Sequence, residues 1–211
     1  MDAQKINEYW MSTDTYLTQE HRDWNAQQIN AYLTQLGWTR EAIAAIIGNM
    51  DVESSVNPAL IEGRGYPSLL TNQQCLVLPD TVGVGLVQWT GYTDTQPAGQ
   101  KLASFAIRYG RDWYDGDVQC FRLEREWNEN LQFDPGTVDG VYYDWNTFVS
   151  STQPPAVLAK AWQVLYERGG SDTEARQLKA NYYYNLLRPQ LPIWLLLAIK
   201  RRRDIRQCRI Q

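Results

Sequence analysis

The stretch from Gly48 to Pro58 constrains this chain most, because it places a carboxylate where a helix must stop. Upstream of it, apolar residues recur at the i, i+3, i+4, i+7 spacing of one buried helix face, namely Ile43, Ile46, Ile47 and Met50. Glu53 lies one turn beyond this face, and Pro58 prevents the helix from continuing. The sequence therefore predicts a helix that opens at Thr39 and ends near Glu53.

The end of such a helix changes the chemistry of a carboxyl group. The negative end of the helix dipole and the neighbouring apolar face both disfavour the ionised form of Glu53. A carboxyl group that keeps its proton near neutral pH can act as a general acid. Most glutamates at helix ends are ordinary solvated charges, so Glu53 needs support from the rest of the chain.

The chain is long enough for one well-buried domain, with 211 residues of which 44% are hydrophobic. Its nine Trp and thirteen Tyr against only four Phe are unusual. Amphipathic rings are useful where a surface is both apolar and wet, as in stacking on sugars, although ordinary core packing is their more frequent use.

Charge is distributed unevenly along the chain. From Arg188 onward there are seven Lys and Arg and one Asp, so this segment carries +6 and the remainder carries −10 of the net −4. An acidic body argues against a nucleic-acid-binding surface, which needs distributed positive charge.

Cysteine and histidine content predicts neither a disulfide framework nor a metal site. The three cysteines, Cys75, Cys120 and Cys208, form no C-x-x-C pair, and His21 is the single histidine. No cofactor-binding motif is present, and the polar N-terminal residues do not resemble a signal peptide.

Three parts are predicted along the chain: an N-terminal arm over residues 1–24, a body over 25–187 and a tail over 188–211. Within the body, apolar periodicity and helix-breaking residues predict helices over residues 25–37, 39–53, 100–109, 117–131, 154–168 and 172–187. Residues 59–81 show no sustained period and are interpreted as a loop or a short irregular hairpin, and residues 133–152 are interpreted as a loop. Residues 83–90 form a β-like run whose glycines allow another backbone or a ligand to approach closely.

The tail combines an apolar run with a basic cluster, over Ile193–Ile199 and Lys200–Arg203. It is too short to span a bilayer, which needs about 20 apolar residues. It suits either a membrane-surface element or a buried docking segment for a partner, and the sequence favours neither.

Six motifs now stand in a recognisable order. They are G-N-M-x-x-E-S-x-x-N-P, G-x-G-L-x-Q-W, K-L-x-x-[FY]-A, Q-x-x-x-L-x-x-E, Y-E-R and R-x-x-x-A, at Gly48–Pro58, Gly83–Trp89, Lys101–Ala106, Gln119–Glu126, Tyr166–Arg168 and Arg176–Ala180. In this order they resemble the phage tail lysozyme family and, more distantly, goose-type lysozymes and lytic transglycosylases. The resemblance covers about residues 25–187 and implies a mainly α (α+β lysozyme-like) fold, with a two-lobed helical body and a small β-hairpin region lining the cleft. Gly169 departs from it, because family members often have proline after Y-E-R.

The resemblance assigns roles to particular residues. Glu53 matches the catalytic acid that protonates a glycosidic oxygen. The substrate-binding residues it implies are Gly85, Leu86, Gln88, Trp89 and Asn57. A packed hairpin is the alternative interpretation of the first four, and Ser54 and Asn57 also suit a role in fixing the helix end.

The second catalytic carboxylate is less clearly marked. An inverting hydrolase needs a base about 6.5–9.5 Å from the acid. Glu62, nearest in sequence to Glu53 across a short loop, is the first candidate, and Asp80 and Asp94 are alternatives. Transglycosylases manage with one glutamate and the substrate's own acetamido group.

The function implied by the resemblance is that of a virion-associated muramidase, located in a phage tail. It would cleave the β-1,4 bond between N-acetylmuramic acid and N-acetylglucosamine during cell entry, with peptidoglycan and other tail proteins as partners. The alternatives are a lytic transglycosylase and a structural tail protein with a lysozyme-like fold but no catalysis.

Overall fold

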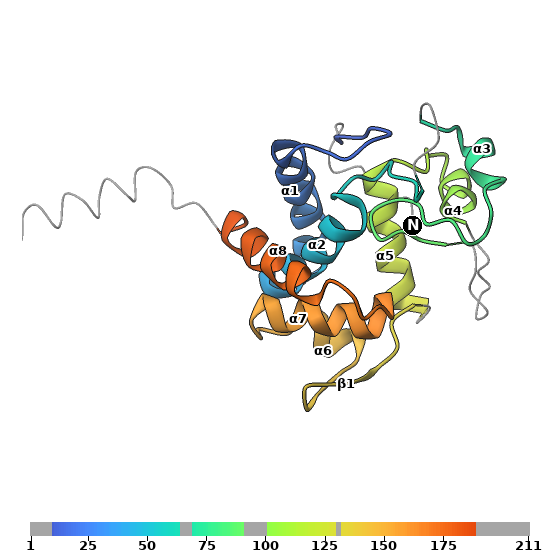
Figure 1. Cartoon of the computed structure of the whole chain (residues 1–211). Coiled ribbons are helices and arrows are strands. Elements are labelled where there is room, and N and C mark those ends of the chain that lie inside the picture. Colours follow the sequence, from blue (N-terminus) through green and yellow to red (C-terminus); the bar gives the residue numbers. More distant parts are fainter. Residues whose placement is uncertain (1–9, 64–68, 91–100, 130–131, 189–211) are drawn as a thin grey trace, which may run out of the picture.

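The computed structural model describes residues 10–63, 69–90, 101–129 and 132–188 (Figure 1). Both segments of the predicted tail, residues 193–199 and 200–203, lie outside these ranges. Among the helices within them, none has the length and apolar character that crossing a membrane requires.

The body is mainly helical with one small antiparallel sheet, as the sequence predicts. In chain order the elements are α1 (Gln19–Gln35), α2 (Arg40–Ser54), α3 (Asn72–Leu76), α4 (Leu102–Arg108), α5 (Gly116–Glu129), β1 (Gly136–Val138), β2 (Val141–Tyr143), α6 (Trp145–Val149), α7 (Pro155–Trp162), the π-helix η1 (Gln163–Glu167) and α8 (Thr173–Leu186). Figure 1 shows α6, α7 and the hairpin on one side of the molecule and α3 and α4 on the other. The central helix α2 packs most extensively against α8 and α7.

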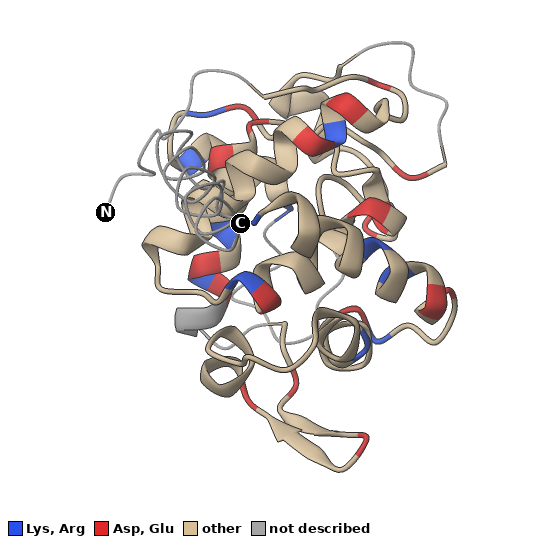
Figure 2. Cartoon of the chain, turned by 90° about the vertical axis from the view of Figure 1, so that its left-hand side faces the viewer, with Lys and Arg blue, Asp and Glu red and all other residues tan. Residues whose placement is uncertain are grey.

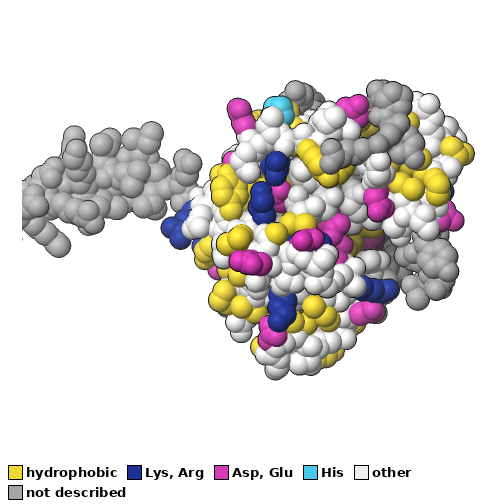
Figure 3. Space-filling view, viewed as in Figure 1, with side chains coloured by type: hydrophobic (Ala, Val, Ile, Leu, Met, Phe, Trp, Pro, Cys, Tyr) yellow, Lys and Arg dark blue, Asp and Glu magenta, His cyan; other side chains and the backbone are white. Residues whose placement is uncertain are grey.

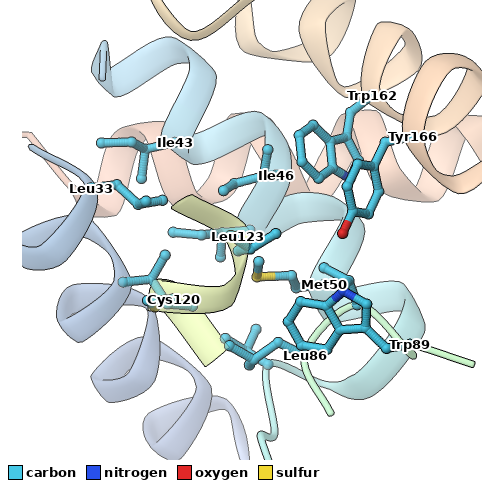
Figure 4. Packing of buried hydrophobic residues seen from close by; sticks show 14 of the residues in the cluster. Leu33, Ile43, Ile46, Met50, Leu86, Trp89, Cys120, Leu123, Trp162 and Tyr166 are labelled. Carbon is cyan, nitrogen blue, oxygen red and sulfur yellow. The ribbon is translucent and has the colours of Figure 1, made fainter. Parts of the chain in front are cut away.

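Helix α2 is buried on all sides and not along one face only. Every residue from Ala42 to Met50 is buried, which is typical of a helix at the centre of a core. Figure 4 shows Ile46 and Met50 among side chains from α5, α7 and the 84–89 turn, including Leu123, Trp162 and Leu86. The position of Glu53 is therefore set by the whole core.

Helices α2 and α8 approach unusually closely at Gly48. A β-carbon added there would lie 2.6 Å from the backbone nitrogen of Ala180 and 2.8 Å from the carbonyl oxygen of Arg176. The motifs G-N-M and R-x-x-x-A are thus the two surfaces of one helix contact.

A buried carboxylate joins α1, α2 and α8. Asp51 accepts from Arg22 at 2.8 Å, from the Tyr183 hydroxyl at 2.7 Å and pairs with Lys179 at 2.9 Å. Figure 2 shows blue and red segments lying side by side on this flank of the molecule. Satisfying a buried charge with three partners holds the three helices in register.

The N-terminal boundary predicted for the first helix is wrong. Helix α1 begins at Gln19, capped by the Thr18 hydroxyl, and so crosses the predicted junction between residues 24 and 25. Its polar first turns carry no hydrophobic period, which is why they look like part of the arm. The described arm residues pack on the body, with the Trp10 indole donating to Asp117 at 3.1 Å. The three-part division itself stays a prediction.

Two segments predicted as irregular contain regular structure. Residues 133–152 form β1, β2 and α6, with Asp139 and Gly140 at positive φ in the hairpin turn. An Asp-Gly pair is a strong hairpin signal, but it cannot be recognised from apolar periodicity alone. Residues 59–81 include α3, whereas the expected β-run at 83–90 is a tight turn with single bridges at Val84.

We predict that Gly48→Ala destabilises the protein by about 1–3 kcal/mol, because the clash with the α8 backbone outweighs the gain in helix propensity of about 1 kcal/mol. Urea unfolding measures the change. Gly169→Ala is the matched control, since its β-carbon would meet no atom within 4 Å. Equal unfolding midpoints for the two variants would contradict this packing.

Candidate active site

Helix α2 ends in a backbone conformation that requires support from its surroundings. It stops at Ser54, as predicted, and Ser55 and Val56 follow with φ of 56° and 53°. A β-branched residue at positive φ is an outlier, and such strain persists where packing dictates it. The Ser54 hydroxyl lies 2.9 Å from the Met50 carbonyl and 2.8 Å from that of Leu86, which ties the helix end to the 84–89 turn.

An arginine from α8 holds the carboxylate of Glu53. Arg176 donates through Nη2 to Glu53 Oε1 and through Nη1 to the amide oxygen of Asn49 at 3.0 Å. Asn49 in turn donates to the carbonyls of Ala45 at 2.9 Å and Ala159 at 3.1 Å, so α2 and α7 both fix its orientation. The Arg176 side chain is 6% exposed and that of Glu53 24%, so the carboxyl group is reachable while its partner is enclosed.

The guanidinium group of Arg176 beside Glu53 was not predicted from the sequence. No pattern within residues 48–58 could reveal it, because Arg176 lies more than 120 residues away.

A second carboxyl group near this pair was not predicted. Glu167 is the last residue of η1 and accepts from the Trp162 indole at 3.0 Å. Burial, and next the charge of Glu53, raise the pKa of Glu167 to about 8, while the Trp162 hydrogen bond and Arg176 act in the opposite direction. Glu167 therefore keeps its proton at neutral pH. In the sequence, Glu167 was noted only as the glutamate of the Y-E-R motif. The π-helix that places it is a feature frequent at functional sites.

A third carboxylate, Glu126 of α5, is structural. It accepts from the Trp89 indole at 2.7 Å, the Tyr166 hydroxyl at 2.6 Å and Arg122 at 3.0 Å. Tyr166 stacks on Trp162 with ring centroids 4.0 Å apart. Figure 4 shows the Tyr166 hydroxyl directed towards the side of the core where Trp89 lies. This network links the 84–89 turn to the residues that hold Glu167.

The predicted cleft-wall residues form a compact turn beside the end of α2. Leu86 is fully buried and its N–H donates to Gln119 at 2.8 Å, while Gly85 has φ of 79° and no room for a β-carbon beside that amide. Gln88 donates to the Gly85 carbonyl at 2.8 Å. Trp89 is 5% exposed and its indole N–H is committed to Glu126. These contacts are those of a packed hairpin, and substrate contact by the four residues stays a prediction.

Asn57 lies buried beneath the N-terminal segment. Its amide nitrogen donates to the carbonyls of Thr13 at 2.8 Å and Thr15 at 2.7 Å, and its oxygen accepts from the N–H of Ala59 at 3.0 Å. It holds the arm against the end of α2. Its assignment to substrate binding is untested by this geometry.

The candidate bases occupy different surroundings. Glu62 is exposed and accepts from the N–H of Gly83 at 3.0 Å, next to the 84–89 turn. Asp80 pairs with Lys101 at 2.9 Å, and Asp94 lies outside the described residues. Figure 3 shows acidic side chains gathered near the middle of the face it displays. The described part of the chain holds no group of three or more residues that could ligate a metal.

The fold and site together are those of a lysozyme-like protein: a mainly helical body with a small sheet, and a glutamate at the end of its buried central helix. Residues 24–187 match the family described as phage tail lysozyme, and the chain belongs to that family. It is also 30% identical over 179 residues to Morphogenesis protein 1 of Bacillus phage B103. That match covers 83% of this chain and 42% of the relative, so the chain spans less than half of the relative's length.

We predict that Glu167→Gln changes how stability depends on pH. An unfolded glutamate ionises near its ordinary value of 4.5, whereas the folded pKa is about 8, so unfolding releases a proton between these values. Wild-type stability therefore falls as pH rises through this interval, and this decline is absent in the variant. The stability difference in favour of the variant should grow up to pH 8 and then stay constant. Unfolding curves measured from pH 4.5 to 9 test this, with the exposed Glu174→Gln as control; parallel wild-type and Glu167→Gln profiles would refute the assignment.

Asn57→Ala should lower the free energy of unfolding by about 1–3 kcal/mol, because the loss of its buried hydrogen bonds releases the arm. The exposed Asn146→Ala is the matched control. A stable Asn57→Ala protein with weakened sugar binding would show instead that this amide serves the ligand.

Proposed function

We propose that this chain is a phage virion-associated muramidase, which cleaves the β-1,4 bond between N-acetylmuramic acid and N-acetylglucosamine during cell entry. The observation that carries the proposal is the partly exposed carboxyl group of Glu53, held by the enclosed Arg176 at the end of a buried helix. Membership of the phage tail lysozyme family supports this assignment of substrate and chemistry.

In the proposed reaction Glu53 donates a proton to the glycosidic oxygen as an oxocarbenium-like transition state develops. Proton transfer leaves a carboxylate, and Arg176 is already placed to stabilise that charge. The 84–89 turn is fastened to the helix end through Ser54, so it is the proposed opposite wall of the cleft.

A hydrolase and a lytic transglycosylase differ in the group that assists the attacking nucleophile. Glu62 is the proposed base of a hydrolase, since it lies exposed beside the turn at Gly83. Glu167 is unsuited to that role at neutral pH, because its raised pKa keeps it protonated. In a lytic transglycosylase the substrate's acetamido group would replace the base and yield an anhydro sugar.

A non-catalytic role in the tail is the second candidate. It is favoured by one observation: the relative from Bacillus phage B103 is named a morphogenesis protein. In either role we propose a location in the virion and contact with other tail proteins.

Glu53→Gln should reduce peptidoglycan cleavage by at least about 100-fold, because the amide cannot supply the proton. Loss of turbidity of purified cell walls measures the rate, and Glu174→Gln should retain wild-type activity. Cleavage by the Glu53→Gln variant at the wild-type rate would refute the catalytic assignment, and an inactive wild type would favour the structural role.

Mass spectrometry of the released muropeptides then distinguishes the two enzymes. The muramidase proposal expects hydrated reducing ends. Anhydro-muramic ends would establish the transglycosylase and remove the need for Glu62.

A further inference from the structure

We propose that the surface around Asn25, Asn57 and Gly116 is a peptide-binding site, which recognises an extended backbone with an indole ring at its first position. In this structure the site holds residues 10–15 of the chain's own N-terminal arm. Figure 1 shows this segment running from the start of α1 towards α5. The inference goes beyond the proposed function and does not depend on it.

Two buried amide side chains bind the backbone of the arm. Asn25 accepts from the N–H of Met11 at 2.9 Å and donates to the Met11 carbonyl at 2.8 Å. Asn57 accepts from the N–H of Thr13 at 3.4 Å and donates to the Thr13 carbonyl at 2.8 Å. Both backbone groups of every second residue lie on one edge of an extended segment, so each amide pairs with the arm as a residue of a neighbouring strand would.

The body of the protein fixes the orientation of both amides. Asn25 also donates to the Val56 carbonyl at 2.9 Å, and Asn57 also accepts from the N–H of Ala59 at 3.0 Å. Both asparagines are fully buried. Without a peptide their remaining donors and acceptors would be buried and unpaired, which is costly. The site therefore favours an occupant that supplies free backbone groups.

A pocket for an indole ring gives the site its specificity for a side chain. Trp10 lies against Gly116, where an added β-carbon would overlap the indole ring. The indole N–H donates to Asp117 Oδ1 at 3.1 Å, and Asp117 is 1% exposed. Arg111 lies 3.5 Å from the other oxygen of this carboxylate. A flat ring fits above the glycine and its N–H meets a buried acceptor, so the pocket selects tryptophan.

The arm joins the body through an exposed hinge. Residues 14–16 are exposed, whereas Leu17 is buried and its carbonyl accepts from Arg22 at 3.0 Å. The packed body thus begins at Leu17. Residues 10–13 meet the body through one indole ring and a few hydrogen bonds, so they can leave the site while α1 stays folded.

A peptide supplied as a separate molecule tests the site. The full chain with Trp10→Ala should bind a synthetic peptide of residues 10–16, because its own arm lacks the indole. Wild type should bind the peptide at least about tenfold more weakly, since its tethered arm competes at an effective concentration of about 1 mM. Isothermal titration calorimetry measures both affinities. Absence of binding to the Trp10→Ala chain, or equal binding to the two chains, would overturn the proposal.

Two changes test the indole pocket. A peptide with alanine in place of its tryptophan should bind the Trp10→Ala chain at least about tenfold more weakly, because the buried aromatic anchor is gone. Adding Gly116→Ala to the Trp10→Ala chain should weaken binding of the unchanged peptide similarly, because the new methyl group fills the pocket. Adding Gly169→Ala instead is the matched control and should leave the affinity unchanged. Equal affinities for the two peptides would refute the pocket.

Hydrogen exchange of the wild-type chain gives a test that needs no variant. Peptide at about 1 mM should displace the arm and speed exchange of the Met11 and Thr13 amides at least about fivefold, while the amides of α2 keep their rates. Unchanged rates at Met11 and Thr13 would refute an exchangeable arm. A wild-type dimer that the peptide dissociates would assign the site to the arm of a second copy and overturn the assignment to the chain's own arm.

Discussion

The contact between Arg176 and Glu53 is the interaction on which the rest of this structure depends. It joins the end of the central helix to α8, and the two helices lie so close at Gly48 that a β-carbon there would be 2.6 Å from the backbone nitrogen of Ala180. Asn49 holds the other side of the guanidinium and is held in turn by α7. Three helices therefore determine the position of one carboxyl group, and the proposed role of Glu53 as a proton donor requires such fixed positioning.

The remaining motifs fasten the 84–89 turn to this centre. Gln119 accepts the N–H of Leu86 and donates to the carbonyls of Pro58 and Trp113, both at under 3 Å. Glu126 receives the Trp89 indole and the Tyr166 hydroxyl. Motifs that lie far apart in the chain thus meet as hydrogen-bonded pairs, and buried polar groups with such full sets of partners specify one arrangement.

Much of this fold could be predicted from the periodicity of apolar residues and from helix-breaking residues. The helix that ends at Ser54 and the helices around Leu123 and Leu158 follow from apolar spacing, and α8 follows from the Gly169-Gly170 turn before it and Pro189 after it. The start of α1 could not, because a polar helix turn carries almost no period. The three-residue strands β1 and β2 also carry almost no period, and their signal in the sequence is the Asp139-Gly140 turn between them.

The candidate site could be predicted from the sequence only in part. The position of Glu53 at the end of a helix could be predicted because it is a local property of the sequence. Arg176 and Glu167 could not, since their roles arise from a helix crossing and a π-helical turn more than 110 residues away. Charge partners of this kind have no signature in spacing, and only the folded arrangement reveals which carboxyl group retains a proton.

The most direct measurement of the central claim is a crystal structure of the Glu53→Gln chain with a peptidoglycan tetrasaccharide bound. The account predicts that a glycosidic oxygen lies within hydrogen-bond distance of the side chain at position 53, between the end of α2 and the 84–89 turn. A sugar bound elsewhere, with position 53 facing only Arg176, would contradict it.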